Sequence, residues 1–220
     1  MGDSAVLSVA RLYRHDAPDT ASEHSHTPHE AVMQADNRDL VRECIDGNRA
    51  AQHELFCTYR DTILRLVWRL LGPRDRHERD DAVQQVFIAL FRSLDRFRYE
   101  SSLDTWVYRI GTRVCMTLLR KRYRKRVLQI DPAASTEIEG VRDRSVSPQE
   151  QLERREREEA LYTALDRLDR HRRTVFVLAE IEGRELEEVA RIIGRPVGTV
   201  KSRLFRARRD LARMLGSLLD

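Results

Sequence analysis

One stretch near the end of the chain decides the fold: Glu185-Leu-Glu-Glu-Val-Ala-Arg-Ile-Ile-Gly194, a tight turn, then Pro196-Val-Gly-Thr-Val-Lys-Ser-Arg-Leu-Phe-Arg-Ala-Arg-Arg209. It predicts two helices with a break between them, because Gly194 can adopt the positive φ that ends a helix and Pro196 has a φ suited to starting one. Apolar residues recur at spacings of three and four on one face of each helix. They are Leu186, Val189, Ala190 and Ile193 in the first helix and Val200, Leu204, Ala207, Leu211 and Met214 in the second.

The opposite face of the second helix is basic and carries one aromatic residue. It comprises Lys201, Ser202, Phe205, Arg206 and Arg209. A phenylalanine among cations on a solvent-facing surface has no core to fill, and the cations suit phosphates and base edges. We interpret the segment as a helix-turn-helix whose second helix enters the major groove of DNA. The simpler alternative is a solvated basic helix with a stray aromatic residue.

The composition suits one domain or two small ones with modest cores. The chain has 220 residues, of which 41% are hydrophobic and 35% charged, and its net charge is +4. No apolar run reaches membrane-spanning length and the N-terminus lacks the apolar centre of a signal peptide, so we expect a cytoplasmic protein without membrane contact. Cys44, Cys57 and Cys115 form no CxxC pair, which favours buried, reduced thiols.

Residues 1–36 lack an apolar period, so we expect a disordered extension. They include the run His24-Ser-His-Thr-Pro-His29, which could bind a transition metal, although a tail that merely carries histidines is the simpler interpretation. His53 and Cys57, four residues apart on an expected helix, could form half of a metal site, but no nearby residue completes it. We therefore predict no metal and no cofactor.

Three helices are expected between residues 39 and 126. Gly72-Pro73 must end the first. The second covers about 78–95, and its outward face holds Asp81, Gln85, Ile88 and Arg92, with Gln84 at the edge. The third buries Leu103, Trp106, Val107, Ile110 and Val114, leaves Tyr108, Arg109 and Thr112 outside, and continues into the basic run 120–126. That run, with a tyrosine inside it, suits a surface that grips a DNA backbone.

Residues 127–147 lose the helical period and collect Pro, Gly, Ser and Asp, which indicates a flexible linker. Beyond it, helices over about 148–169 and 171–181 lead into the helix-turn-helix. No segment has the alternation of a strand. The sequence therefore predicts an all-α protein with two small helical domains, 37–126 and 148–220.

These pieces together resemble the extracytoplasmic-function (ECF) branch of the sigma-70 family of bacterial RNA polymerase sigma factors. Asp81-Ala-Val-Gln-Gln-Val-Phe87 is similar to the family's polymerase-binding segment, and Phe97-Arg-Tyr-Glu-Ser-Ser-Leu-Asp-Thr-Trp-Val-Tyr-Arg-Ile110 to its promoter-melting segment. Residues 168–215 resemble its DNA-binding region 4. The resemblance implies an initiation subunit with no catalytic activity of its own, whose partners are core RNA polymerase, promoter DNA and commonly an anti-sigma factor.

The resemblance also implies roles for individual residues. Asp81, Gln84 and Gln85 are expected to contact the clamp helices of the largest polymerase subunit, on the face shared with Ile88 and Arg92. Recognition and opening of the minus-10 element is expected of Phe97, Arg98, Tyr99, Ser101, Ser102, Tyr108, Arg109, Arg113, Arg120 and Arg122. Reading of the minus-35 element is expected of Thr199, Lys201, Ser202, Phe205, Arg206 and Arg209.

The chain departs from the family at two of these positions. Gln85 stands where the family commonly has Glu, which weakens a charge-assisted contact to the polymerase. Arg113 stands where it commonly has Asn, and brings donors but no acceptor to the base-reading surface.

Two other classes of function compete with this interpretation. A free-standing helix-turn-helix regulator would explain residues 196–209 equally well, but it leaves the outward face of 81–92 and the loop 97–102 without a purpose. A nucleic-acid enzyme ranks last, because the sequence has no carboxylate cluster, phosphate-binding loop or nucleophile constellation.

Overall fold

The structure, a computed structural model, describes residues 38–73, 75–127 and 148–219, and all its regular elements in these ranges are helical. The expected N-terminal extension, with its histidine run, lies outside these residues. So does the expected linker, except for Val127. Within them, no helix is both long and apolar enough to cross a membrane. The all-helical fold predicted from the sequence is confirmed.

The elements form two units. In the N-terminal unit, a short helix over 38–45 precedes α3 (Arg49–Leu71), α4 (Arg76–Ser93), the 3-10 turn η1 (Leu94–Arg96) and α5 (Leu103–Val127). The C-terminal unit comprises α6 (Pro148–Arg167), α7 (Arg170–Phe176), the π-helical segment η2 (Val177–Ile181), α8 (Leu186–Ile193) and α9 (Val197–Leu219).

The helix ends follow the local chemistry of the chain. The Asn48 side chain caps α3 by accepting hydrogen bonds from the backbone N–H groups of Ala50 and Ala51. Gly72, with φ +78°, ends the same helix. A Cβ on Gly72 would lie 2.9 Å from Cδ1 of Tyr162, so the close approach of α6 also requires glycine here. Gly194, with φ +63° and ψ +46°, ends α8 in the left-handed conformation that the sequence predicts.

Each unit buries the apolar face of its helices. In the N-terminal unit, Leu55, Ile63 and Leu66 of α3 are fully buried, together with Val86 and Leu90 of α4. In the C-terminal unit, the predicted stripe of α9 is confirmed: Val200, Leu204, Ala207 and Leu211 are buried and Met214 is half-buried. Arg173 of α7 is also buried and forms an ion pair with Asp166 of α6.

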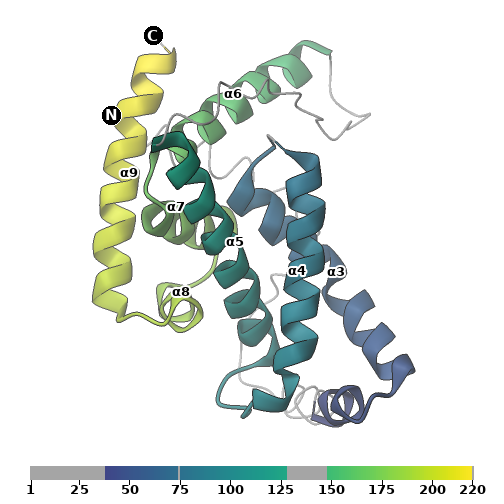
Figure 1. Cartoon of the computed structure of the whole chain (residues 1–220). Coiled ribbons are helices and arrows are strands. Elements are labelled where there is room, and N and C mark those ends of the chain that lie inside the picture. The colour runs from purple at the N-terminus through teal and green to yellow at the C-terminus, as the bar shows by residue number, and fades with distance from the viewer. Residues whose placement is uncertain (1–37, 74, 128–147, 220) are drawn as a thin grey trace.

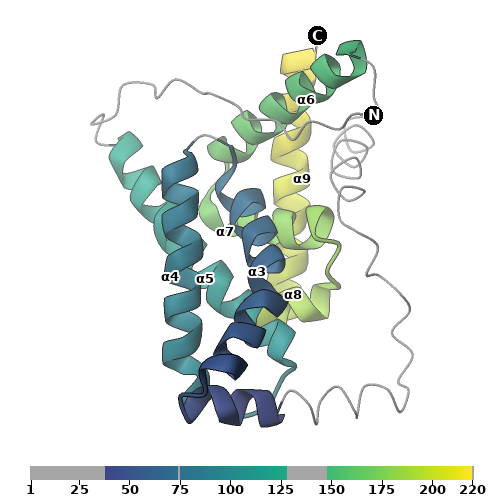
Figure 2. The ribbon, with the colours of Figure 1, turned by 90° about the vertical axis from the view of Figure 1, so that its right-hand side faces the viewer.

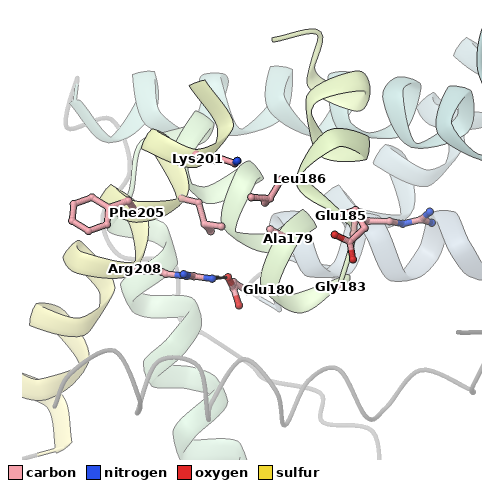
Figure 3. Close-up of a pocket in the computed structure, with 10 residues that line it drawn as sticks. Ala179, Glu180, Gly183, Glu185, Leu186, Lys201, Phe205 and Arg208 are labelled. Atoms are coloured by element: carbon pink, nitrogen blue, oxygen red, sulfur yellow. Dashed lines mark hydrogen bonds and ion pairs between the residues drawn. The ribbon is translucent and has the colours of Figure 1, made fainter. Parts of the chain in front are cut away.

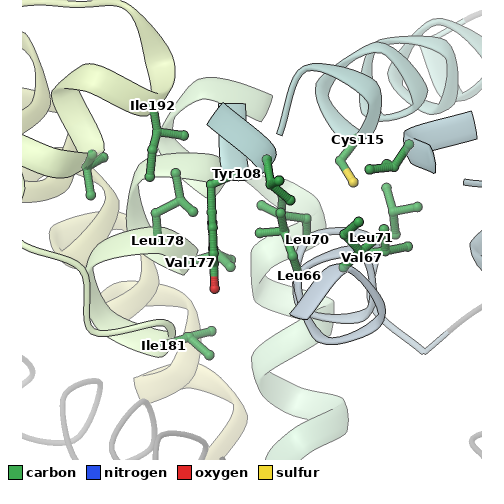
Figure 4. Packing of buried hydrophobic residues seen from close by; sticks show 14 of the residues in the cluster. Leu66, Val67, Leu70, Leu71, Tyr108, Cys115, Val177, Leu178, Ile181 and Ile192 are labelled. Atoms are coloured by element: carbon green, nitrogen blue, oxygen red, sulfur yellow. The ribbon is translucent and has the colours of Figure 1, made fainter. Parts of the chain in front are cut away.

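The two units pack directly against each other. α5 lies in the middle of the molecule, with α3 and α4 on one side and α7 and α8 on the other (Figure 1). α6 lies at one end, beside the C-terminal part of α9 (Figure 2). The buried apolar residues form one continuous cluster instead of two separate cores, with Leu66 and Leu70 of α3 facing Tyr108 and the residues Leu178 and Ile192 (Figure 4).

This packing overturns part of the prediction for α5. Tyr108 and Thr112 were expected on the outside of that helix, but both are buried, and Arg109 is half-buried. The helical period of apolar residues in the sequence distinguishes an apolar face of α5 from a polar face. It does not indicate whether a second unit of the same chain covers the polar face. Ile192 of α8, outside the predicted apolar stripe, is buried for the same reason.

Candidate nucleic-acid and polymerase interfaces

The outward face of α4 is as the sequence predicts. Asp75 caps the helix, its side chain accepting a hydrogen bond from the backbone N–H of Glu78. The opposite side of α4 is buried through Ala82, Val86 and Leu90. The predicted polymerase-facing residues are all exposed: Asp81, Gln84, Gln85, Ile88 and Arg92. Ile88 leaves 52% of its surface in water, which is high for a large aliphatic side chain.

Two apolar side chains of α3 are also exposed, and the sequence analysis did not identify them. The Phe56 ring lies 4.5 Å from that of Phe87, centroid to centroid, yet more than a third of Phe56 stays exposed. Leu64, two turns further along α3, is also exposed. Both residues are apolar but lie outside the buried stripe that passes through Leu55 and Ile63. An apolar residue outside the apolar stripe is the sequence signal that could have identified them.

The loop 97–102 has a buried base and an exposed tip. Phe97, one of the predicted minus-10 residues, is buried against Trp106, with ring centroids 5.4 Å apart, so its ring packs inside the loop and does not face solvent. Ser102 caps α5, its hydroxyl accepting a hydrogen bond from the backbone N–H of Thr105 at 3.2 Å. Arg98 and Ser102 are exposed, and Ser101 is half-buried.

Tyr99 stands at the tip of this loop in an unusual conformation. Its φ is +58°, which is uncommon for any residue with a side chain and more so for an aromatic one. The guanidinium of Arg38 lies 5.1 Å from the ring centroid, and the ring remains partly exposed. Backbone strain of this kind gathers at binding sites, where the surrounding structure holds it in place.

The cations of α5 differ in how available they are. Arg113 and Arg120 are exposed, as predicted. Arg122 was expected beside them, but it is half-buried and bound internally. Its Nε donates to Glu78 Oε2 at 2.7 Å, and its Nη1 donates to the Leu71 carbonyl oxygen at 2.6 Å. The prediction that Arg122 faces outward is therefore wrong, because the end of α3 and the start of α4 supply its partners.

Tyr108 and Arg109 contact the C-terminal unit. The Tyr108 hydroxyl donates to Glu182 Oε2 at 2.9 Å, and Arg109 Nη2 donates to the Arg191 carbonyl oxygen, also at 2.9 Å. Burial raises the pKa of the Tyr108 hydroxyl above its ordinary value, and the Glu182 carboxylate raises it further. These two predicted minus-10 residues are thus occupied by partners within the chain.

The exposed face of α9 has the predicted composition. Lys201, Ser202, Phe205, Arg206 and Arg209 are exposed and Thr199 is half-buried. Phe205 leaves 65% of its surface in water. The Ser202 hydroxyl forms a hydrogen bond within the helix, because its Oγ donates to the Thr199 carbonyl oxygen at 3.0 Å.

A cavity of about 400 Å³ lies between α9 and the turn that joins η2 to α8. Its lining mixes Leu186 and Leu204 with charged side chains, among them Arg208 and Glu180, which form an ion pair. Phe205 stands at its edge and extends away from the other lining residues (Figure 3). The exposed ring therefore fills no pocket of its own domain.

The cysteines depart in part from the prediction. Cys44 and Cys115 are buried and reduced, and burial raises the pKa of the Cys115 thiol to about 12. Cys57 is exposed, contrary to expectation, with its Sγ 3.5 Å from Nε2 of His53. In the part of the chain that the structure describes, no three His, Cys, Asp or Glu residues are grouped so as to hold a metal ion.

A helix-turn-helix with an exposed basic face, carried beside a second helical unit, is the architecture of a DNA-binding transcription protein. The family comparisons agree with this class. Residues 55–125 match the Sigma-70 region 2 family, and residues 158–211 match the Sigma-70 region 4 family.

Curated relatives align over nearly their whole length. The RNA polymerase sigma-H factor of Pseudomonas aeruginosa is 32% identical over 191 residues, which is 86% of this chain and 98% of that protein. The ECF RNA polymerase sigma-E factor of Escherichia coli is 31% identical over 172 residues, 77% of this chain and 88% of that protein. The chain belongs to the ECF sigma factors of the sigma-70 family. It is thus a non-enzymatic subunit for transcription initiation that binds core RNA polymerase and promoter DNA, which excludes the two competing classes.

Solved structures share the fold. The structure of CnrH in complex with the cytosolic domain of CnrY has a TM-score of 0.56 and 24% identity, covering 82% of this chain and 97% of that chain. The sigma factor RpoE in complex with the anti-sigma factor NepR from Bartonella quintana has a TM-score of 0.56 and 23% identity, covering 74% and 96%.

Proposed function

We propose that this sigma factor uses three separate faces to direct RNA polymerase to its promoters. The outward face of α4 binds the clamp helices of the largest polymerase subunit. The loop 97–102 and the exposed cations of α5 recognise and open the minus-10 element. The exposed face of α9 reads the minus-35 element in the major groove. Residues 37–126 and 148–220 are the corresponding domains, and residues 127–147 connect them.

The α4 face is the observation that carries this proposal. Its polar members make no side-chain hydrogen bond or ion pair with any other described residue, and Ile88 stands exposed among them. Phe56 and Leu64 of α3 are further exposed apolar side chains in the same unit. A polar rim around exposed apolar side chains, on a helix whose other side is filled by the core, is the pattern of a protein-binding surface.

Loss of side chains from this face should separate polymerase binding from DNA binding. The double variant Asp81→Ala with Gln84→Ala is expected to bind core polymerase about tenfold more weakly, equivalent to about 1.4 kcal/mol, because two polar contacts are lost at the interface. Binding of the full chain to a minus-35 duplex should not change. A pull-down titration and a duplex titration measure the two affinities.

Phe205→Ala is the matched control, since it should weaken duplex binding and leave core affinity intact. An unchanged core affinity for the α4 double variant would remove the polymerase role from this face. Run-off transcription with core polymerase, followed by sequencing of the transcript start sites, tests the function as a whole.

We further propose that the protein works in the cytoplasm on a stress- or signal-responsive regulon under the control of an anti-sigma factor. Family membership supports this regulation. The two structural relatives above also support it, because each was solved with a second protein bound, in one case a named anti-sigma factor.

A further inference from the structure

A histidine and a cysteine contact each other on the outer side of α3. Cys57 Sγ lies 3.5 Å from Nε2 of His53, which is one helical turn earlier in the chain. Both side chains are exposed, and neither belongs to the residues assigned above to polymerase or DNA. The pair therefore has no role in the function proposed above.

The separation of the two atoms fits a tetrahedral metal ion. Zn²⁺ binds a thiolate sulfur at about 2.3 Å and an imidazole nitrogen at about 2.0–2.1 Å. At the tetrahedral angle of about 109°, these bond lengths place the sulfur and the nitrogen about 3.5 Å apart. The distance between Cys57 Sγ and His53 Nε2 is the same, so the ion can enter without moving either atom. Without metal, a hydrogen bond between the thiol and the imidazole accounts for this distance.

The helix holds both ligands in place before a metal ion binds. α3 is 23 residues long, and the Asn48 side chain caps its first turn. Leu55 and Tyr59, on the opposite side of the helix from the pair, are buried in the core. Residues four apart on a helix stand on the same side, one turn from each other. Since the backbone is already fixed, metal binding restricts only the rotation of two short side chains.

One chain supplies only half of the ligands that such an ion needs. A structural zinc ion has four protein ligands, and two cysteines with two histidines are a common set. Among the described residues, no third His, Cys, Asp or Glu completes the group around His53 and Cys57. Cys44 and Cys115 are buried, so neither thiol can bind an ion at this surface. The sequence predicts no metal for this reason, and a second copy of the chain would supply what one copy lacks.

The surface around the pair is open to a second molecule. Four exposed side chains follow one another on the same side of α3 at spacings of four, three and four: His53, Cys57, Arg60 and Leu64. The first turns of α3 lie at an edge of the molecule (Figure 1). Arg60 forms an ion pair with Asp61 of its own helix, so these two residues add no net charge that would repel a second copy. Leu64, 41% exposed, adds a small apolar contact.

We propose that His53 and Cys57 form half of a zinc site, and that a second copy of the chain supplies the other half. One Zn²⁺ then has two thiolates and two imidazoles as ligands, related by a twofold axis through the ion. Each Cys57 thiol gives up its proton on binding, so two protons are released for each ion bound. The two thiolates balance the charge of the ion. Leu64 alone offers too little apolar surface for a stable interface, so the dimer depends on the metal.

Sedimentation velocity of the full chain measures this dimer. A phosphine reductant is present throughout, so that Cys57 stays a thiol and cannot form a disulfide between copies. With a chelator the chain should sediment as a monomer, and half an equivalent of Zn²⁺ should convert it to a dimer that holds one ion per two chains. A dimer that persists with chelator and reductant, or a zinc-loaded monomer, would overturn the proposal.

Co²⁺ in place of Zn²⁺ identifies the ligands. Tetrahedral Co²⁺ with thiolate ligands has intense visible bands and a sulfur-to-cobalt charge-transfer band in the near ultraviolet. Both should appear with the native chain and reach their maximum at half an equivalent of Co²⁺. The weak visible bands of octahedral Co²⁺, without the charge-transfer band, would contradict a site that contains Cys57.

Substitution of either ligand should abolish the dimer. Cys57→Ser and His53→Gln should each lower the apparent affinity for Zn²⁺ by more than about a hundredfold, because each removes two of the four ligands of a symmetric site. Both positions are exposed, so circular dichroism should show an unchanged fold. His77→Gln is the matched control, since it removes another exposed imidazole, on α4, and should change neither dimer nor spectrum.

The histidine run of the N-terminal extension needs a control of its own. The triple variant His24→Gln, His26→Gln and His29→Gln should still form the zinc-dependent dimer and give the Co²⁺ charge-transfer band. If the triple variant loses the dimer and Cys57→Ser keeps it, the extension binds the metal and the proposal is overturned.

Discussion

α5 and α9 are both long basic helices for which the sequence predicts DNA contacts, and they have different surroundings in the molecule. On α9, Phe205 and Arg206 stand in solvent, and no residue of another helix in the described part of the chain forms a hydrogen bond or ion pair with Arg206. On α5, Tyr108 is 3% exposed beneath the C-terminal unit, and Arg122 is held by Glu78 and the Leu71 carbonyl oxygen. The same kinds of side chain are exposed for the proposed recognition of DNA on one helix and bind partners within the chain on the other.

The difference shows where a helical period is a reliable guide. One apolar stripe fixes which face of α9 is buried, because the helices that pack on it, α6, α7 and α8, belong to its own unit. α5 is contacted by α3 and α4 on one side and by α7 and α8 on the other, so residues on its polar side also find partners. An arginine or tyrosine on that side is a DNA contact only if no second element of the chain reaches it first.

The largest expected effect separates two arginines of α5. Arg122→Ala should destabilise the protein by about 2–3 kcal/mol, because it leaves the half-buried Glu78 carboxylate and the Leu71 carbonyl oxygen without their donor. Arg120→Ala should change stability by less than about 0.5 kcal/mol, since its side chain is exposed. Urea unfolding of the two variants measures the difference. Equal unfolding midpoints for the two variants would show that Arg122 is not held inside the protein, and that it is available to DNA as Arg120 is.

On α9, a matched pair of variants should separate base contacts from phosphate contacts. Phe205→Ala should lose about 1–3 kcal/mol on the preferred minus-35 duplex and little on a scrambled one, because an apolar ring can contribute only through base edges. Arg209→Ala should weaken binding to both duplexes and reduce the salt slope by about one. The measurement is a salt titration of the full chain on the two duplexes. Equal losses on both duplexes for Phe205→Ala would show that its ring does not read sequence.

The smallest effect concerns the covered face of α5 at high pH. The folded-state pKa of Tyr108 is raised by burial and by the Glu182 and Asp104 carboxylates, against the opposing influence of Arg184. Above pH of about 10 the unfolded chain therefore loses a proton that the folded chain keeps, so stability must fall as pH rises, by up to about 1.4 kcal/mol per pH unit. Tyr59 is also buried with a raised pKa and adds to the slope.

Unfolding free energies measured between pH 8 and 11 test this prediction, with pH 8 below and pH 11 above the ordinary tyrosine pKa of about 10. Tyr108→Phe should reduce the slope and leave the contribution of Tyr59. An identical slope in the variant would mean that Tyr108 is not protected from ionisation, and that the face of α5 is open in solution.

The sequence by itself determined the helices, their ends and the outward faces of α4 and α9. It could do so because these features depend on neighbours in the chain. Gly72 and Gly194 end helices through their own φ, and Asn48 caps through its own side chain. The α4 face is polar because Asp81, Gln84 and Gln85 recur at the three- and four-residue spacing that places side chains on one side of a helix. The motifs in residues 81–110 and 196–203 also sufficed to indicate the family.

Only the tertiary structure decided which polar residues of α5 are available. Tyr108, Thr112 and Arg122 lie at positions that the local pattern marks as outward, and their burial depends on residues far along the chain. Glu182 reaches Tyr108 across a sequence separation of 74 residues, and Glu78 reaches Arg122 across 44. Pairing at such a distance depends on how the helices pack together, and no local period encodes that arrangement.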